Sequence, residues 1–302
     1  MGAAMSSLSQ ELAEAVEVAG RHVVRIEGRR RGPSSGIVWG GAEGLVVTTH
    51  HVLERDEGIG VGLPDGTVTT AKVVGRDPGT DLALLRVEAS GLAVPAWGEA
   101  DSVRVGFLAL AISRPGRSAR ARLGIVSAVG EAWRTPAGGR LDRYVETDLG
   151  IEIGFSGSAL VGANGHVLGL NTAGLMRGTS LAVPAATVRR VVDSLLAHGE
   201  VPRGYLGIGT YPVELPASLH ETAGQAAALL VVSVQPGSAA ATAGIVLGDA
   251  LLAMDGHRLT HPRQLLALLD EDRIGKEAVV RIVRAGELRE VHITIGTRQG
   301  RG

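Results

Sequence analysis

The stretch from Gly44 to Leu53 reads G-L-V-V-T-T-H-H-V-L, and runs of this kind decide the fold class. Each run is short, rich in β-branched residues and bounded by turn-forming residues. Similar runs recur from His22 to Val183, separated by Gly, Pro and Asp-Gly, as in the turn Leu63-Pro64-Asp65-Gly66. Many short strands with frequent turns and no intervening helices predict a mainly β domain, a barrel or a sandwich.

Two helices are expected to bracket this β region. Ser7 to Gln10 reads S-x-x-Q, a capping-box pattern, and helically spaced apolar residues follow it. At the other end, residues Ala185–His198 have apolar side chains at helical spacing and stop before Gly199. We therefore expect a first domain over residues 1–199.

A second domain is expected over residues 203–296, after a short linker at Glu200–Arg203. Its length of roughly 90 residues lies within the usual size range of domains. It mixes strand-like runs with a helical segment at Pro262–Leu269. The sequence thus predicts a small α+β domain behind a mainly β one.

Composition excludes several classes of protein. The 302 residues include 30 basic and 31 acidic side chains, so the net charge of −1 argues against a nucleic-acid partner. Cysteine is absent, which excludes thiolate catalysis and zinc–thiolate sites, and the histidines show no metal-ligand spacing. We expect no metal and no cofactor.

No membrane segment is expected either. The longest apolar run, Ala226–Val232, is far shorter than the roughly 20 residues that a span needs. The N-terminus lacks the basic start and apolar core of a signal peptide. As written, the sequence predicts a soluble, cytoplasmic chain without a transmembrane segment.

Three motifs carry the parts of a serine hydrolase. They are V-V-T-T-H-H-V at Val46–Val52, G-R-D-P-G-T-D-L-A at Gly75–Ala83, and G-F-S-G-S-A at Gly154–Ala159. Acyl transfer needs a serine nucleophile, an imidazole that takes its proton and a carboxylate that orients the imidazole. His51, Asp81 and Ser156 supply these groups in the chain order His, Asp, Ser, which is that of chymotrypsin.

At these motifs the sequence resembles the HtrA/DegP family of trypsin-like serine proteases. The stretches Gly169–Ala173 and Gly124–Ser127 fit the same family pattern. The resemblance implies a chymotrypsin-like double β-barrel with the triad in the cleft between the barrels. By this match His51, not His50, is the general base; neighbours on a strand point to opposite faces, so His50 is expected to be a bystander.

The resemblance further implies an oxyanion hole formed by the backbone N–H groups of Gly154 and Ser156. Four residues depart from the family pattern around the site: Thr49 and Phe155 stand in place of Asn, Ser158 in place of Gly and Ala159 in place of Pro. Phe155 changes how the oxyanion loop is held, since Phe cannot form the backbone hydrogen bonds that Asn can. Ser158 is a competing nucleophile whose flanking residues do not fit.

Substrate preference is read from the residue six positions before the nucleophile, which lies at the base of the primary pocket in trypsin-like folds. Here that residue is Gly150, so no carboxylate is expected there for Lys or Arg. Residues 173–180 would form another wall. We expect small or medium apolar side chains at the cleaved position, while the direction of the Glu152 side chain is left open.

The second domain resembles a PDZ domain through R-G-Y-L-G-I at Arg203–Ile208 and two further glycine-containing stretches, Pro236–Ala240 and Gly248–Gly256. PDZ domains add a peptide strand to a sheet edge and hold its terminal carboxylate on backbone N–H groups. The implied donors are Leu206, Gly207 and Ile208. Leu265, Leu266 and Leu269 on the helical segment either line an apolar pocket or belong to the core.

Together these features predict a serine endopeptidase that acts on unfolded or damaged proteins and binds C-terminal peptides through its PDZ domain. The resemblance also implies homotrimers formed through the protease domain and, in most family members, export from the cytoplasm. The alternative is a catalytically inactive, protease-like binding or chaperone protein that recruits partners through the PDZ domain. The departures around Ser156 favour that alternative, and the complete triad opposes it.

Overall fold

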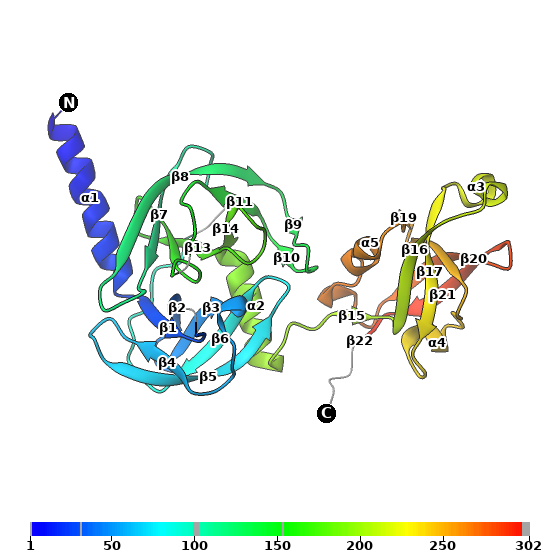
Figure 1. Ribbon diagram of the computed structural model, residues 1–302, viewed down its shortest axis with the longest axis horizontal. Coiled ribbons are helices and arrows are strands. Elements are labelled where there is room, and N and C mark those ends of the chain that lie inside the picture. The colour runs from blue at the N-terminus through cyan, green and yellow to red at the C-terminus, as the bar shows by residue number, and fades with distance from the viewer. Residues whose placement is uncertain (1, 31, 99–102, 153, 298–302) are drawn as a thin grey trace. The chain divides into compact units, whose positions relative to one another are not determined.

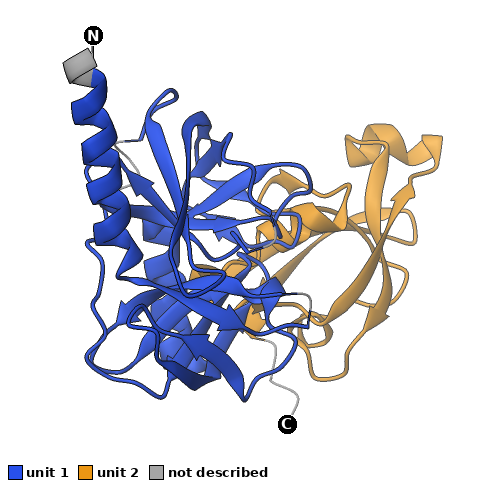
Figure 2. Ribbon diagram, turned by 60° about the vertical axis from the view of Figure 1, so that its left-hand side comes forward, with its two compact units in different colours: residues 1–201 blue, residues 202–302 orange. Residues whose placement is uncertain are grey.

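The short apolar runs of the sequence form strands that close into two barrels (Figure 1). The computed structural model describes residues 2–30, 32–98, 103–152 and 154–297. The chain divides into two compact units, residues 1–201 and 202–302 (Figure 2). The boundary falls within the segment Glu200–Arg203, and both barrels belong to the first unit.

The first barrel is entirely antiparallel and closes in the order β1-β2-β3-β6-β5-β4. Its strands are β1 (Val23–Glu27), β2 (Ser34–Gly40), β3 (Leu45–Thr49), β4 (Ile59–Gly62), β5 (Val68–Asp77) and β6 (Leu82–Val87). The barrel interior is aliphatic, with Val24, Ile26, Val46 and Ile59 fully buried. Directly after β3, residues His50–Val52 form a 3-10 turn, η1.

The second barrel closes in the order β11-β14-β13-β12-β7-β8. Its strands are β7 (Leu108–Ser113), β8 (Arg120–Gly130), β11 (Tyr144–Thr147), β12 (Ala159–Gly162), β13 (Val167–Thr172) and β14 (Ser180–Pro184). A small pair, β9 (Trp133–Arg134) and β10 (Arg140–Leu141), lies between β8 and β11 in the chain. The predicted mainly β, double-barrel fold is therefore confirmed.

Helix α2 (Ala185–His198) packs against both barrels, touching β5 and β6 of the first and β13 and β14 of the second. Val188, Val191, Val192 and Leu195 form its fully buried face. Burial of each such side chain contributes on the order of 1.5–3 kcal/mol. The helix ends as its sequence indicates, because Gly199 has φ 76° and its N–H donates to Leu195 O.

The N-terminal helix differs from its predicted start. Helix α1 spans Gly2–Gly20 and begins ahead of the expected cap at Ser7. The Ser7 hydroxyl instead donates to the Glu11 carboxylate at 3.0 Å, a bond inside the helix. The later turns pack on β7 and β12, with Ala15 and Ala19 buried, while the first turns extend past the barrels in both ribbon views (Figures 1 and 2).

The second unit is built around one antiparallel sheet with the strand order β16-β17-β18-β20-β21 and a short β19 beside β18. These strands are β16 (Ile208–Glu214), β17 (Ala227–Val234), β18 (Ala250–Met254), β19 (His257–Arg258), β20 (Glu277–Arg284) and β21 (Glu287–Thr294). Around the sheet lie α3 (Ala217–Ala223), α4 (Ala239–Thr242), α5 (Pro262–Ala267), the 3-10 turn η3 (Glu271–Arg273), and the pair β15 (Gly204–Tyr205) and β22 (Gly296–Thr297).

Helix α5 is shorter than the predicted Pro262–Leu269. His261 caps its start and Gln264 completes a capping box, but Leu268 leaves the helical conformation. Within the described ranges, no helix of either unit has the length and apolar character that a membrane crossing requires.

Candidate active site

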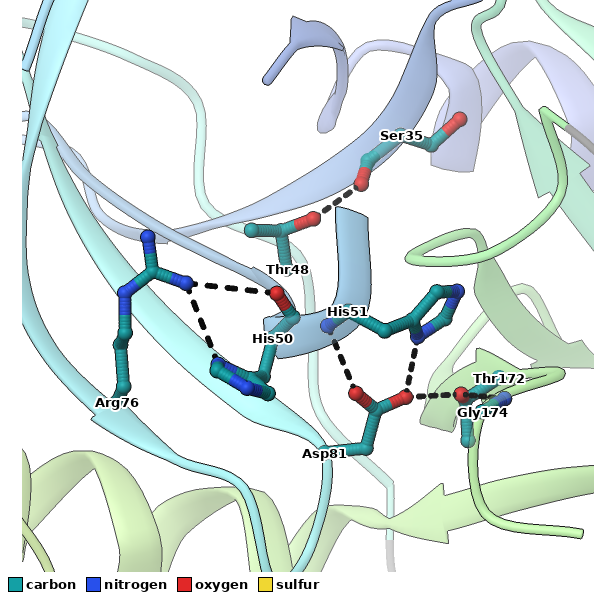
Figure 3. Close-up of polar contacts among 8 residues, drawn as sticks. All are labelled: Ser35, Thr48, His50, His51, Arg76, Asp81, Thr172 and Gly174. Carbon is teal, nitrogen blue, oxygen red and sulfur yellow. Dashed lines mark hydrogen bonds and ion pairs between the residues drawn. The ribbon is translucent and has the colours of Figure 1, made fainter. Parts of the chain in front are cut away.

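His51 and Asp81 form a hydrogen-bonded pair on the first barrel (Figure 3). The Nδ1–H of His51 donates to Asp81 Oδ2 at 2.7 Å, and the backbone N–H of His51 donates to the other carboxylate oxygen at 2.9 Å. A carboxylate only accepts hydrogen bonds, so this contact fixes the histidine tautomer with Nδ1 protonated. The Nε2 lone pair of His51 is left free to accept a proton.

The D-P-G-T-D motif is a turn that presents Asp81. The Asp77 carboxylate accepts hydrogen bonds from the N–H groups of Gly79 and Thr80 and from the Thr80 hydroxyl, at 2.6–3.1 Å. Asp81 follows with φ 59°, a conformation that costs a non-glycine residue about 1 kcal/mol or more. The buried turn holds the strained residue in place and aims its carboxylate at His51.

Two further residues complete the surroundings of Asp81. The Thr172 hydroxyl donates to Asp81 Oδ2 and accepts from the N–H of Gly174 (Figure 3). A Cβ at Gly174 would lie 2.4 Å from Asp81 Oδ2 and 2.5 Å from His51 Nδ1, so only glycine fits there. From the sequence, Thr172 belonged only to a stretch that fits the family pattern and Gly174 only to an expected pocket wall, because no local signal links either residue to Asp81.

His50 points away from His51 and contacts Arg76 instead (Figure 3). The Arg76 guanidinium donates to His50 Nδ1 at 3.2 Å and to the carbonyl of Leu53 at 3.1 Å. Burial and the Arg76 cation lower the pKa of His50. The two histidines lie on a 3-10 turn rather than a strand, and it is this turn that directs their rings apart.

Ser156 lies in the tight turn before β12. Gly157 has φ 80°, and a Cβ there would lie 1.9 Å from the carbonyl oxygen of Ser35, which explains glycine after the serine. Ser35 on β2 also holds the turn directly: its N–H donates to Ser156 O at 3.1 Å and its hydroxyl to Gly154 O at 3.2 Å. The second-barrel loop is thus tied to a strand of the first barrel.

One cavity of about 460 Å³ brings the two sides of the site together. Its lining residues are Arg29, His51, Ile151, Glu152, Ser156 and Ala173. Among the described residues there is no hydrogen bond between His51 and Ser156, although both border this cavity. Catalytic hydrogen bonds are often long in ligand-free geometry and shorten when substrate binds.

The predicted oxyanion donors lie beside the nucleophile. The carbonyls of Gly154 and Ser156 are both bound by Ser35, as described above. Neither backbone N–H finds an acceptor within the part of the chain that the structure describes. Both N–H groups, on either side of Phe155, therefore remain available as donors, which an oxyanion hole requires.

The competing serine, Ser158, is excluded from the cavity. It is fully buried, and its Oγ accepts a hydrogen bond from the side-chain amide of Asn171 at 3.0 Å. Thr49 is also fully buried, and its hydroxyl has no hydrogen-bond partner among the described residues. Of the two serines in the motif, only Ser156 borders the open site.

Glu152, whose direction the sequence left open, borders the cavity and pairs with Arg122. The guanidinium of Arg122 lies 2.9 Å from the Glu152 carboxylate and also donates to the carbonyl of Gly150. The predicted pocket base at Gly150 therefore carries no carboxylate, and the nearby one is neutralised by an arginine.

The predicted carboxylate-binding loop of the second unit precedes an edge strand. Gly207 has φ 78°, and a Cβ there would lie 2.2 Å from Ser238 Cβ, so this turn requires glycine. The carbonyls of Leu206 and Gly207 accept from Ala240 and Gln235, which holds the loop. Ile208 begins β16, which pairs with β17 on one side and, in the sheet as described, with no strand on the other.

Helix α5 packs beside β16, so the predicted carboxylate-binding loop is followed by an edge strand that has a helix next to it. Of the three leucines noted in the sequence, Leu265 and Leu269 are buried in the core of the unit, as the core alternative predicted. Leu266 is exposed.

Two family models match the chain. Residues 34–170 match the trypsin-like peptidase domain, and residues 204–295 match the PDZ domain. The chain is 34% identical over 259 residues to a probable periplasmic serine endoprotease, DegP-like, of Chlamydia trachomatis, covering 84% of this chain and 52% of that protein. A probable periplasmic serine protease, do/HhoA-like, of Haemophilus influenzae is 34% identical over 274 residues, covering 88% and 58%. The chain spans about half the length of these curated relatives.

Solved structures with both parts of the fold are also similar. An HtrA-type protease, AlgW, with a tripeptide is 31% identical, with a TM-score of 0.70 over 96% of this chain and 98% of that one. The serine endoprotease of Yersinia pestis is 30% identical, with a TM-score of 0.71 over 95% and 98%.

Proposed function

The chain belongs to the HtrA family of serine proteases with a PDZ domain, and on this premise we propose that it is a serine endopeptidase acting through His51, Asp81 and Ser156. One observation carries the proposal: Ser156 and His51, whose ring is oriented by the Asp81 carboxylate, border the same cavity. The relatives named as serine proteases support the activity.

The roles follow from the hydrogen bonds. Ser156 Oγ attacks the scissile carbonyl carbon while His51 Nε2 takes the hydroxyl proton. The imidazolium formed is stabilised by the Asp81 carboxylate, already bonded to Nδ1–H. His51 then gives its proton to the leaving amine as the C–N bond breaks, and the same base activates the water that hydrolyses the acyl-enzyme. No metal or cofactor takes part in these steps.

The N–H groups of Gly154 and Ser156 act as the oxyanion hole. The charge on the carbonyl oxygen develops only as the tetrahedral intermediate forms, so donors held in place lower the barrier rather than merely binding substrate. Removal of one such donor typically costs about a hundred- to a thousand-fold in kcat.

The cleaved residue is proposed to be small or medium and apolar. Ile151 and Ala173 are the apolar residues that line the cavity, Gly150 brings no side chain, and the Glu152 carboxylate is paired with Arg122. Cleavage mainly after Lys or Arg in a peptide library would contradict this preference.

The PDZ domain is proposed to bind the C-termini of other polypeptides. The terminal carboxylate would accept from the N–H groups of Leu206, Gly207 and Ile208, and the peptide would pair with the free edge of β16. The AlgW structures contain a bound tripeptide or decapeptide, which supports peptide binding in this family.

Unfolded or damaged polypeptides are the proposed substrates, and a homotrimer is the proposed assembly. Both rest on the family resemblance. The periplasmic names of the two curated relatives favour an exported chain over a cytoplasmic one.

The activity is tested with unfolded casein as substrate, with and without added C-terminal peptides. We expect cleavage by the native chain and none by His51→Ala, with native melting temperatures for both. Cleavage should also fall on acidification, because an imidazolium cannot accept the serine proton. A folded native chain that cleaves nothing, even with peptides, would favour the binding-protein alternative.

A further inference from the structure

Arg122 on β8 reaches across to the loop that precedes the nucleophile. Its guanidinium donates to the carbonyls of Leu149, at 3.3 Å, and of Gly150, and it pairs with the Glu152 carboxylate at 2.9 Å. The same group lies over the ring of Phe155, 4.4 Å from its centroid. One side chain therefore contacts four residues of a loop that ends at Ser156.

Phe155 connects the Arg122 contact to the candidate active site. The ring is buried in the core of the second barrel, packed with residues such as Ile151 and Leu160. Phe155 lies between Gly154 and Ser156, the two proposed oxyanion donors. A planar guanidinium can stack on a ring and donate in its own plane at the same time, which a lysine ammonium cannot do. Arg122 thus fixes the ring and the loop carbonyls together.

The ion pair also affects the charge of the substrate cavity, which the cationic side chain of Arg29 lines as well. Glu152 borders the cavity with Ser156, and Arg122 is its only ion-pair partner among the described residues. The Glu152 side chain is 75% exposed, so the pair contributes little to stability. Its importance lies in specificity, because an unpaired carboxylate there would attract a basic side chain of the substrate.

We propose that Arg122 is a positioning and specificity residue: it holds residues 149–152 and Phe155 so that the N–H groups of Gly154 and Ser156 face the substrate, and it keeps Glu152 from selecting Lys or Arg. The inference rests on the proposed protease activity. It accounts for Phe155, because a ring under an arginine replaces the backbone hydrogen bonds that an asparagine would form.

The test compares Arg122→Gln, Arg122→Lys and the double variant Arg122→Gln/Glu152→Gln on two quenched peptides that differ only in Val or Arg at the cleaved position. Arg120→Gln is the matched control, since Arg120 is an exposed arginine on the same strand. Melting temperatures and fluorophosphonate labelling rates are measured for every variant.

For Arg122→Gln we expect kcat on the Val peptide to fall about 10- to 100-fold, with little change in KM, because the loss is in the oxyanion donors. The labelling rate should fall in parallel, and relative cleavage of the Arg peptide should rise several-fold. The double variant should keep the low kcat but show no rise in relative cleavage of the Arg peptide. Arg122→Lys should also show the low kcat without increased cleavage of the Arg peptide, because lysine keeps a positive charge beside Glu152.

Arg122→Gln values equal to those of Arg120→Gln on both peptides would overturn the inference while leaving the protease activity intact. If Arg122→Gln does not fold, Arg122→Lys is the deciding variant. A native kcat of Arg122→Lys on the Val peptide would overturn the positioning role. A native chain that cleaves neither peptide and takes no label would overturn the proposed function together with this inference.

Discussion

The two halves of the candidate active site are held in different ways. On the first barrel, His51 and Asp81 are fixed by short bonds among a turn, a strand end and Thr172, with no space left at Gly174. On the second barrel, Ser156 follows a loop whose position depends on side chains from elsewhere, Ser35 and Arg122. The proposed base is rigidly held, whereas the geometry of the proposed nucleophile and oxyanion donors depends on a few long-range contacts.

The largest loss of activity is expected from a substitution on the first barrel, Asp81→Asn. Asparagine keeps the shape but can donate to His51 Nδ1, which leaves the wrong tautomer at Nε2. We expect kcat to fall about ten-thousand-fold with KM nearly unchanged. A loss below about tenfold, measured on casein or a peptide, would show that Asp81 does not orient the base.

Gly174→Ala tests how tightly that side is packed. The added Cβ would displace the His51–Asp81 pair, and a misplacement of about 1 Å can cost a hundred-fold in rate. Gly116→Ala is the matched control, because a Cβ there has nothing within 4 Å. Equal kcat/KM for the two variants would contradict the packing argument.

Thr172→Val removes the hydroxyl that donates to the Asp81 carboxylate and accepts from the N–H of Gly174, while keeping the side-chain volume. A hydrogen bond to a charged group is worth about 1.5–3 kcal/mol, so we expect kcat/KM to fall roughly 10- to 150-fold. Thr172→Ser retains the hydroxyl and should keep most of the activity. Failure of the serine variant to do so would assign Thr172 a packing role only.

Around Ser156, Ser35→Ala removes the hydroxyl that donates to Gly154 O and accepts from the backbone N–H of Arg114, but keeps the backbone bond to Ser156 O. A neutral hydrogen bond contributes about 0.5–1.5 kcal/mol, so a two- to ten-fold loss of labelling rate is expected. A larger effect than that of Thr172→Val would reverse the comparison between the two halves.

The smallest expected effect concerns His50 and the pH dependence of stability. Its lowered pKa, due to burial and to Arg76, means that the unfolded chain binds a proton before the folded one does. The contribution of neutral His50 to the free energy of unfolding is therefore present above about pH 6.5 and is lost as the pH falls below it. His50→Gln should flatten the decline between pH 7.5 and about 5.5 in urea denaturation; an unchanged decline would contradict this role.

The sequence predicted most readily the residues that lie in locally shaped motifs. His51 follows a strand, Asp81 ends a self-bonded turn, and Ser156 precedes a glycine that no other residue can replace. The end of helix α2 at Gly199 was also predictable, because a glycine in the left-handed conformation is a local signal. These features need no knowledge of distant contacts.

The contacts that hold these site residues in place were not predictable in the same way. Thr172 contacts Asp81 across 91 positions, and Ser35 contacts Gly154 across 119. Nothing in the sequence distinguishes Arg122 from the other arginines. Only its position on β8, beside Phe155, does so. The expected helix start at Ser7 failed because a capping pattern is also compatible with a helix interior, where Ser7 bonds to Glu11.

Fluorophosphonate labelling, followed by mass spectrometry of the modified peptide, shows directly whether Ser156 is the nucleophile. It is performed on the native chain, Ser156→Ala, Ser158→Ala and His51→Ala. The account predicts one adduct, on Ser156, that persists in Ser158→Ala and disappears in Ser156→Ala and His51→Ala. An adduct on Ser158, or labelling that survives without His51, would contradict it.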